Sequence, residues 1–447
     1  MATVRMCPVL PMLFLWILVR DSEAHRYVDS GLDFAASFGS ISSSVTCPAN
    51  ASWIFYGIMF DAGSTGTRIH VYTFIQKDRE GLPILDNEMF DSVKPGLSAY
   101  ADMPEYAGHM VRQLLKIAKN TVPRVVWKQT PLVLKATAGL RLLPPAKAHA
   151  LLEEVQNVFD ESPFYVPADS VSILSGTNEG ILAWVTLNFL TAFKNVLVGH
   201  LYPKTKKTVG ILDLGGGSTQ ITFLPKSKKT IERVPADYIA RFDVFNTTYE
   251  LYTHSSLGHG IKAARLAAMG ALTSEGLERK AFKTFCLPKQ YKGEFSFGGF
   301  TYKVNGISDG NTGYKICYQE MLKVVKGIIQ QPYELKDSSV FYAFSYYFDH
   351  AVEANLIDEA QGGTLQVLDF KKKAKEVCNR MSLYNPDFPF LCMDLAYITC
   401  LLKDGYGFQE NAALELTKKV NNVEASWALG AAISYLEHIT QNTYFPL

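Results

Sequence analysis

Two segments of the chain place an aspartate directly before a turn rich in Gly, Ser and Thr: FDAGSTGTRIHVYTF, which contains Asp61, and LDLGGGSTQITF, which contains Asp213. Each segment has the pattern of an apolar strand, a tight turn and a second apolar strand. The backbone N–H groups and hydroxyls of such a turn can surround phosphate oxygens without a lysine. An adjacent Asp suits a hard divalent cation such as Ca²⁺ or Mg²⁺. The two segments therefore predict two phosphate-binding turns, each with a metal-associated carboxylate.

The spacing of the two aspartates indicates an internal repeat. A single Gly-rich hairpin is weak evidence because such turns are common punctuation between strands. Asp61 and Asp213, however, lie 152 residues apart, which is about one domain. The P-loop pattern GxxxxGK[ST] is absent from the sequence, so P-loop chemistry is excluded. Two domains with matched turns would instead hold a polyphosphate from both sides, and positioning with charge neutralisation is most of phosphoryl-transfer catalysis.

The length, composition and net charge of the chain limit the classes of protein and partner to consider. The chain has 447 residues, of which 48% are hydrophobic, and carries 44 Lys and Arg against 43 Asp and Glu. The length predicts two or more domains, and the apolar content excludes a disordered chain. The near-zero net charge gives no electrostatic reason to expect a nucleic acid or an anionic membrane surface as partner. Any polyanion must therefore be bound locally, at a site.

The elements around the two turns alternate between strand and helix, which predicts an α/β fold with mixed sheets. We expect helices near Glu105–Lys119, Ala146–Phe159 and from about Ala425 to the C-terminus, and strands in WIFYGIMF, TRIHVYTF and PLVLKATAG. The predicted domains are 51–175, completed by a C-terminal helix at 425–447, and 176–424. Within the second domain, residues 280–410 have the composition of a loop-rich, cysteine-bearing elaboration.

The N-terminal segment predicts the compartment. Arg5, an apolar run of eleven residues from Val9 to Val19 and small residues up to Ala24 match a signal peptide. Such a run is too short to cross ~30 Å of hydrocarbon, although an uncleaved anchor is the alternative. We expect residues 1–24 to be removed, 25–50 to form a flexible leader, and the mature protein to have no membrane span. It would then reside in the endoplasmic reticulum lumen and/or be secreted.

Six cysteines outside this segment fit an oxidising compartment. Six thiols allow 15 pairings, but the local spacing favours Cys286–Cys317 and Cys378–Cys392, which leaves Cys47 and Cys400 unassigned. A zinc site is the competing interpretation, but the sequence has no Cys-x-x-Cys pair to support it. Two sequons, at Asn50 and Asn246, could carry glycans.

Five segments, in chain order, resemble the motifs of the apyrase family of nucleoside di- and triphosphate hydrolases. They are DAGSTGTRIHVY (61–72), KATAGLRLLP (135–144), GTNEGILAWVTLNFL (176–190), ILDLGGGSTQITF (211–223) and VEASWALGAAI (423–433). The resemblance implies two RNase H-like domains of the actin/hexokinase/chaperone-ATPase superfamily, with the active site in the cleft between them. It also implies hydrolysis of nucleoside diphosphates, with UDP and GDP preferred as in the soluble lumenal branch, and a need for Ca²⁺ or Mg²⁺. The sequence does not determine the oligomeric state, for which we expect a monomer.

The same resemblance implies residue roles. Glu179 matches the general base that activates a water, and Ser218 and Gln220 match residues that position this water. Asp61 and Asp213 match metal-associated carboxylates, and Thr137 and Trp427 match residues that line the cleft, although Trp427 could equally be core. Arg141 is ambiguous, since an exposed Arg at a helix end would look the same. The phosphate cradle would consist of Gly63, Ser64, Thr65, Gly66, Thr67, Arg68, Gly215, Gly216, Gly217, Ser218 and Thr219.

Recognition of the base is the least determined part of the prediction. An aromatic face is expected to stack on the nucleobase, and the run FYAFSYYFDHA lies in the region that supplies it in the family. Within this run we choose Tyr347, with Tyr346 and Phe348 as alternatives. Two other functions remain open: a nucleotide-driven binding module of the chaperone-ATPase or actin type, and an exopolyphosphatase.

Overall fold

The computed structural model describes residues 53–77, 83–192, 208–244, 247–271, 281–308, 312–327, 329–332, 335, 340–383 and 386–442. The predicted signal peptide and leader, Cys47 and both sequon asparagines lie outside these residues. Across the described ranges, no helix combines the length and the apolar character needed to cross a membrane.

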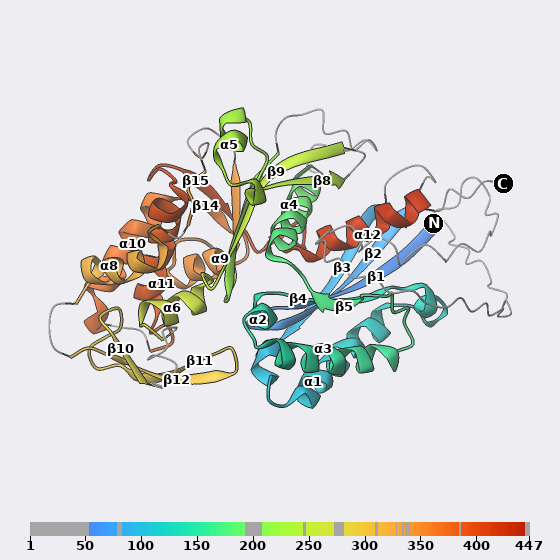
Figure 1. Cartoon of the computed structure of the whole chain (residues 1–447), viewed down its shortest axis with the longest axis horizontal. Coiled ribbons are helices and arrows are strands. Elements are labelled where there is room, and N and C mark those ends of the chain that lie inside the picture. The colour runs from blue at the N-terminus through green and yellow to red at the C-terminus, as the bar shows by residue number, and fades with distance from the viewer. Residues whose placement is uncertain are drawn as a thin grey trace. The chain divides into compact units, whose positions relative to one another are not determined.

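The first sheet has five strands in the order β3-β2-β1-β4-β5 (Figure 1). Its first three strands are antiparallel neighbours, and β4 and β5 add parallel to β1. The strands are β1 (Trp53–Ala62), β2 (Thr67–Gln76), β3 (Ile84–Val93), β4 (Leu132–Ala136) and β5 (Val171–Ile173). The predicted strands WIFYGIMF, TRIHVYTF and PLVLKATAG are therefore confirmed as β1, β2 and β4.

One face of the first sheet is covered by two amphipathic helices, α1 (Pro104–Thr121) and α3 (Pro145–Asp160). Apolar residues of β1, β2 and β4 alternate with a period of two, so that Ile58, Phe60 and Leu134 pack on these helices. The predicted helices Glu105–Lys119 and Ala146–Phe159 are confirmed, with their ends moved by one or two residues. Three short helices complete this region: η2 (Leu97–Tyr100), η3 (Arg124–Gln129) and α2 (Ala138–Arg141).

The second sheet has seven strands in the order β14-β15-β13-β6-β7-β9-β8. Its central five repeat the first sheet: β6, β7 and β9 are antiparallel neighbours, and β13 and β15 add parallel to β6. The strands are β6 (Gly210–Leu214), β7 (Ser218–Phe223), β8 (Ile239–Val244), β9 (Thr247–Leu257), β13 (Phe341–Ser345), β14 (Gly363–Gln366) and β15 (Ala413–Leu416). The repeat read from the two Asp-Gly segments is therefore a repeat of whole sheets.

Helices α4 (Gly176–Ala192) and α12 (Ala428–Asn442) lie between the two sheets (Figure 1). One hydrophobic cluster joins Met59 and Tyr72 of the first sheet, Ile211 and Phe344 of the second, and residues of both helices. Because α4 is packed on more than one side, its segment ILAWVTLNFL is apolar without an amphipathic stripe. The chain reaches α12 through the strand pair β16 (Lys419–Val420) and β17 (Val423–Glu424).

The outer face of the second sheet carries a large core formed by helices and two disulfides. The helices are α6 (Ile261–Ala268), α8 (Tyr314–Val325), α9 (Tyr346–Glu353), α10 (Val367–Asn379), α11 (Leu391–Cys400) and the π-helical turn η7 (Leu401–Tyr406), while α5 (Lys228–Arg233) lies apart from them, beside β9 in Figure 1. A small separate sheet, in the order β10-β12-β11, consists of β10 (Ala281–Thr284), β11 (Lys292–Phe297) and β12 (Phe300–Gly306). Residues 280–410 therefore also supply β13 and β14 of the second sheet, so they are part of its framework as well as an elaboration.

Both predicted disulfides, Cys286–Cys317 and Cys378–Cys392, are present. The sulfur atoms of Cys317, Cys378 and Cys392 lie within 4.8 Å of one another, so the two bridges are neighbours in one core. Because the bridges use these thiols, the zinc interpretation is wrong for them. Cys400 is a buried free thiol.

Candidate active site

The two Gly-rich turns connect equivalent strands of the two sheets. The first loop (Gly63–Gly66) joins β1 to β2, and the second loop (Gly215–Gly217) joins β6 to β7. The two loops face each other closely: a methyl group added to Gly216 would lie 2.5 Å from Cγ2 of Thr65 and 2.6 Å from Oγ of Ser64. The structure thus brings both predicted phosphate turns to one place.

The second loop is held in a defined orientation by its carbonyl groups. The carbonyls of Gly215 and Gly216 accept hydrogen bonds from the first N–H groups of α6, and that of Gly217 accepts one from Gly258. In a planar trans peptide the C=O and N–H point in opposite directions. The N–H groups of Gly216, Gly217 and Ser218 therefore point away from these donors, which is the arrangement of an anion-binding nest.

Glu179 reaches the second sheet because small residues let α4 approach it. Gly176 and Gly180 lie one turn apart on α4, and a methyl group on either would meet a hydroxyl of β7 or β9 within 2.5 Å. Ser175 caps the helix by accepting a hydrogen bond from the N–H of Asn178. The glycines of the GTNEG motif thus set the depth at which Glu179 is placed.

Glu179, Ser218 and Gln220 form one hydrogen-bonded cluster. The Gln220 Nε2 atom lies 3.2 Å from Oε2 of Glu179, 2.8 Å from Oγ of Ser218 and 3.0 Å from Oγ of Ser255. Ser218 and Gln220 share a face of β7 because side chains alternate along a strand. Gln220 therefore links the other two residues assigned to water activation.

Arg141 is the residue that joins this cluster to the first sheet. From the end of α2 its Nη2 donates to Oε2 of Glu179 at 2.7 Å and to Oγ of Ser218 at 3.1 Å, and its Nη1 donates to the Leu174 carbonyl. Sequence reasoning left Arg141 ambiguous. Its position in the same KATAGLR segment as Thr137 was the available signal.

Burial controls the charge state of Glu179. Desolvation raises its pKa to about 7, and the Arg141 guanidinium partly offsets this. A carboxylate with a pKa near neutrality is suited to accept a proton from water. Both hydrogen bonds to this carboxylate end on Oε2, and no described residue gives Oε1 a hydrogen-bond partner.

Asp61 and Asp213 occupy equivalent positions in the two hairpins. Asp61 pairs across the strand with Arg68, whose Nη1 lies 3.0 Å from its Oδ2, whereas Asp213 pairs with Gln220. Burial raises the pKa of Asp213 to about 6. In both residues Oδ1 is buried and has no hydrogen-bond partner in the part of the chain that the structure describes. Two unpaired buried carboxylate oxygens at one site fit the ligand chemistry of a hard divalent cation.

A buried network that the sequence analysis did not single out supports Arg68. His70 Nδ1 lies 2.7 Å from Oε1 of Glu88, and His70 Nε2 lies 3.6 Å from Oε2 of Glu424. Glu424 in turn lies 3.9 Å from Arg68. Burial alone would lower the pKa of His70, but the hydrogen bond to Glu88 and the charge of Glu424 raise it. The alternation of Arg68 and His70 along β2, which puts both on one face, was the sequence signal.

Two predicted roles are corrected by the structure. Thr219 points to the opposite face of β7 from Gln220, and its hydroxyl contacts the Asp213 carbonyl and the Tyr406 hydroxyl in the core. Its side chain therefore cannot bind phosphate. Tyr347 is 0% exposed and packs in the core of the second sheet, so it has no free face for a base. Its neighbour Tyr346 is half-buried, and Phe348 is also core.

Three further residues of the predicted site are buried. Thr137 precedes α2 and is buried, as is Thr67 at the start of β2. Trp427 is buried before α12, with an indole N–H that has no partner in the described residues.

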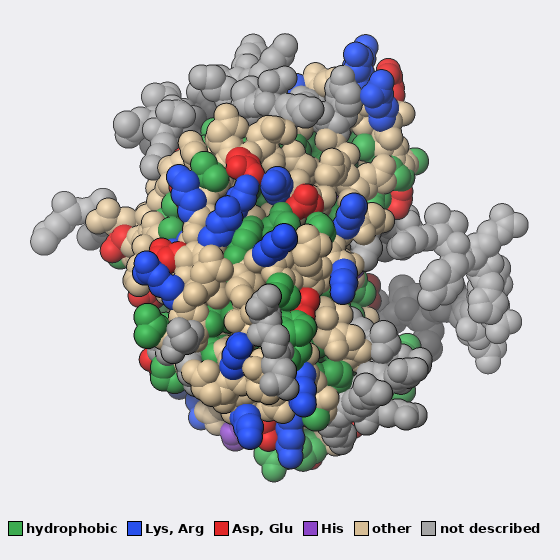
Figure 2. Space-filling model, turned by 90° about the vertical axis from the view of Figure 1, so that its left-hand side faces the viewer, with side chains coloured by type: hydrophobic (Ala, Val, Ile, Leu, Met, Phe, Trp, Pro, Cys, Tyr) green, Lys and Arg blue, Asp and Glu red, His purple; other side chains and the backbone are tan. Residues whose placement is uncertain are grey.

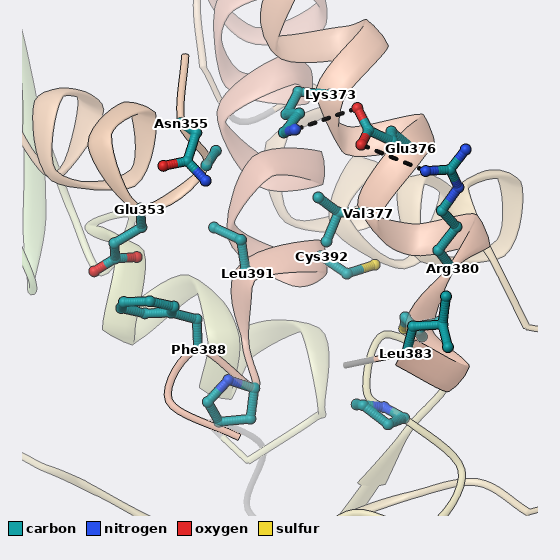
Figure 3. Close-up of a pocket in the computed structure, with 14 residues that line it drawn as sticks. Glu353, Asn355, Lys373, Glu376, Val377, Arg380, Leu383, Phe388, Leu391 and Cys392 are labelled. Atoms are coloured by element: carbon teal, nitrogen blue, oxygen red, sulfur yellow. Dashed lines mark hydrogen bonds and ion pairs between the residues drawn. The ribbon is translucent and has the colours of Figure 1, made fainter. Parts of the chain in front are cut away.

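A separate cavity of about 360 Å³ lies among α9, α10 and α11 (Figure 3). The carboxylate of Glu376, which lines the cavity, forms ion pairs with Lys373 and Arg380, so these three side chains balance one another's charge in part. None of the residues predicted to be catalytic or to bind phosphate lines this cavity. On the face shown in Figure 2, several Lys and Arg side chains gather in the upper left, with single Asp and Glu side chains among them.

Two repeated sheets, each with a Gly-rich loop after its first strand, agree with the expected fold class, that of the actin/hexokinase/chaperone-ATPase superfamily. The chain is similar in structure to nucleoside triphosphate hydrolases from Neospora caninum, with a TM-score of 0.60 and 13% sequence identity over 88% of this chain and 96% of that chain. The sequence model of the GDA1/CD39 (nucleoside phosphatase) family matches residues 46–445. The chain therefore belongs to the GDA1/CD39 (nucleoside phosphatase) family, and it is a hydrolase.

Relatives with high identity cover most of the chain. The chain is 59% identical to ectonucleoside triphosphate diphosphohydrolase 5 of Gallus gallus, over 88% of this chain and 90% of the relative. It is 55% identical to nucleoside diphosphate phosphatase ENTPD5 of Homo sapiens, over 90% of this chain and 92% of the relative. It is 45% identical to ectonucleoside triphosphate diphosphohydrolase 6 of Homo sapiens, over 88% of this chain and 79% of the relative. Nucleotidases of the family are generally dependent on a divalent cation.

Proposed function

We propose that this chain hydrolyses nucleoside diphosphates, with UDP and GDP preferred, to a nucleoside monophosphate and phosphate. The observation that carries the proposal is the cluster of Glu179, Ser218 and Gln220 beside two facing phosphate loops. The printed name of the human relative, a nucleoside diphosphate phosphatase, supports the substrate class.

In this proposal Glu179 acts as the general base. Its Oε1 accepts a proton from water, while Arg141 and Gln220 hold Oε2 and fix the carboxylate in place. The Oε1 atom of Gln220 is buried without a partner among the described residues, and it can accept a hydrogen bond from the same water. The water oxygen forms the new bond to the terminal phosphorus, and the bond from that phosphorus to the bridging oxygen breaks.

The phosphates would be held by the N–H groups of the second loop, the hydroxyls of Ser64 and Thr65, and Arg68. Asp61 and Asp213 would hold Ca²⁺ or Mg²⁺ through their unpaired oxygens, directly or through water. When bound, the cation neutralises charge on the phosphates and on the leaving oxygen. The nest in the second loop supplies the same kind of stabilisation from fixed dipoles.

We assign base stacking to Tyr346, which was an alternative in the sequence analysis. Its ring stacks on His350 with centroids 5.4 Å apart, and it is half-buried, unlike Tyr347. Burial raises the pKa of its hydroxyl, while a hydrogen bond with Thr65 of the first loop and the charge of Arg265 lower it, which supports a position beside the phosphate loops. Base–aromatic stacking contributes about 1–3 kcal/mol.

One assay tests the proposed reaction against its alternatives. Phosphate release is measured from UDP, GDP, ADP, UTP and polyphosphate, with Ca²⁺ or Mg²⁺ and with EDTA. We expect release from UDP and GDP, less from triphosphates and none in EDTA. Release from polyphosphate alone would establish an exopolyphosphatase, and turnover too slow for an enzyme would favour a nucleotide-driven binding module. UTP hydrolysis as fast as UDP hydrolysis would contradict the diphosphate preference.

The compartment is part of the same proposal. The two disulfides support an oxidising environment, either the endoplasmic reticulum lumen or the outside of the cell. Fractionation of cells that express the full chain, with a glycosidase shift assay for Asn50 and Asn246, tests this. A cytosolic, unglycosylated product with free thiols would contradict it.

A further inference from the structure

The hairpin formed by β11 and β12 contacts the active site, although its sequence carries none of the family motifs used above. In Figure 1 these strands run from the second sheet's helical region toward α2 and α1. The tip, Phe297–Phe300, consists of two glycines between two phenylalanines. Phe297 is half-buried, and Phe300 is 55% exposed.

Phe297 packs against the second phosphate loop. A methyl group added to Gly217 would lie 3.5 Å from Cζ of Phe297, 3.1 Å from Cδ1 of Leu142 and 3.0 Å from Cβ of Ala138. Ala138 and Leu142 belong to α2 and its C-terminal end, on the side of the first sheet. The hairpin and α2 therefore both lie against Gly217.

Gly299 packs against η2, the short helix next to the first phosphate loop. A methyl group added to Gly299 would lie 3.3 Å from the Ser98 carbonyl oxygen and 4.0 Å from that of Ala99, both in η2. The segment that enters η2 lies directly on the first loop, since a methyl group on Gly96 would meet the Gly63 carbonyl oxygen at 2.3 Å. The hairpin thus reaches the first loop through η2.

We propose that Phe297 and Gly299, in the tip of the β11–β12 hairpin, are positioning residues for the hydrolysis, which set the spacing of the two phosphate loops. Phe297 holds the second loop against α2, and Gly299 rests on η2 beneath the first loop. Arg141, one residue before Leu142, bonds to Glu179 and Ser218, so a shift of this contact also moves the water-activating cluster. Misplacement of reacting groups by about 1 Å can cost about 10²-fold in rate.

The two tip glycines provide a matched pair of variants. Gly298 and Gly299 both have a positive φ, +62° and +81°, so Ala is strained at either position. Only Gly299 faces a neighbour, because nothing lies within 4 Å of a methyl group on Gly298. Gly298→Ala therefore reproduces the backbone cost of Gly299→Ala without disturbing η2.

The test measures kcat/KM for nucleotide turnover and the thermal midpoint of the full chain in both variants. We expect equal shifts of the midpoint, a loss of kcat/KM of about three- to tenfold in Gly299→Ala, and a change below about twofold in Gly298→Ala. Equal kcat/KM in the two variants would overturn the proposal, because a purely structural hairpin affects both alike.

A second pair keeps the proposal testable if Gly299→Ala does not fold. Phe297→Ala should lower kcat/KM by about 10- to 100-fold, and Phe297→Leu, which refills most of the contact with Gly217, should restore most of it. Phe300→Ala, at the exposed end of the tip, is the control. The inference rests on the proposed function because turnover is what the test measures. An inactive wild-type chain would contradict the proposed function. An active wild-type chain with unchanged kcat/KM in Phe297→Ala would contradict the role of the hairpin.

Discussion

The hairpins β1–β2 and β6–β7 have the same topology, the same loop chemistry and an aspartate in the same place, yet their opposing residues differ. Across from Asp61 stands Arg68, which forms an ion pair with it. Across from Asp213 stands Gln220, which instead turns its amide to Glu179, Ser218 and Ser255. In the first hairpin the guanidinium of Arg68 balances the charge of Asp61. In the second hairpin no Arg stands opposite Asp213, and burial raises its pKa.

In the proposed function, this difference divides two tasks between the two repeated hairpins. The first hairpin has a fixed positive charge and suits the binding of phosphate. The second has neutral amide and hydroxyl groups and suits the orientation of water for Glu179. A single cross-strand position, occupied by Arg68 or by Gln220, separates the two tasks.

The largest effect is expected from removing the proposed base, Glu179, which forms a hydrogen bond with Gln220 of the second hairpin and with no described residue of the first. Glu179→Gln keeps the shape of the side chain but cannot accept the proton, so kcat for UDP should fall by about 10²–10⁴-fold. Phosphate release measures kcat, and calorimetry checks that UDP still binds. The control is Glu153→Gln on the exposed face of α3, and near-normal kcat in folded Glu179→Gln would mean that Glu179 is structural.

A substitution that makes the second hairpin resemble the first should have the next largest effect. In Gln220→Arg the guanidinium would pair with the carboxylates of Asp213 and Glu179, lower the pKa of both and withdraw Oε1 of Glu179 from water. We expect kcat to fall by about 10²-fold. Thr222→Ser, further along the same face of β7, is the control. Retention of normal kcat in Gln220→Arg would show that the identity of this cross-strand residue does not divide the two tasks.

The third test compares the two aspartates as holders of the cation. Asp213→Asn and Asp61→Asn should each raise the metal concentration for half-maximal rate, by about tenfold or more. Asp61→Asn should have the larger effect, because it also leaves the Arg68 charge unbalanced beside the cation. Titration of Ca²⁺ and Mg²⁺ into EDTA-treated protein measures this, and an unchanged metal requirement in both variants would exclude the two residues as ligands.

The smallest effect is a pH dependence of stability from Glu179. Its pKa is about 7 in the folded state against 4.5 for an ordinary Glu, so the folded state holds a proton that the unfolded state has released between these values. The free energy of unfolding of the wild type, relative to Glu179→Gln, should therefore fall by about 1–3 kcal/mol as pH rises from about 4.5 to about 7. Urea titrations at four pH values measure it, and parallel curves would contradict the raised pKa. The same ionisation should make kcat/KM rise with pH through about 7.

Much of this arrangement could be predicted from the sequence because the signals are local. The strand–turn–strand patterns located both hairpins, and period-two alternation placed Ser218 and Gln220 on one face of β7. The same rule puts Thr219 on the opposite face, so its assignment to the phosphate cradle neglected alternation. Cysteine spacing was sufficient for both disulfides because each closes a short loop.

The remainder depends on contacts between residues distant in the chain. Tyr346 and Tyr347 are chemically alike and adjacent, and only the start of α9 after β13 decides which ring is core. The contact of Arg141 with Glu179 and the link from His70 to Glu424 join segments that share no sequence pattern. The hairpin tip at Phe297–Phe300 was read as part of a loop-rich region, since its partners, Gly217 and η2, come from two other parts of the chain.

The position of α12 has a consequence for biosynthesis. This helix packs on β1 and α4 and completes the core that contains Met59 and Tyr72, yet it follows β1 by most of the length of the chain. At a chain growth of ~5–20 residues per second, the face of the first sheet waits on the order of 20–70 s for this helix to be synthesised. The first sheet, although it emerges from the ribosome early, can therefore be completed only after the second sheet has been made, and its apolar face must be kept from aggregation throughout that interval.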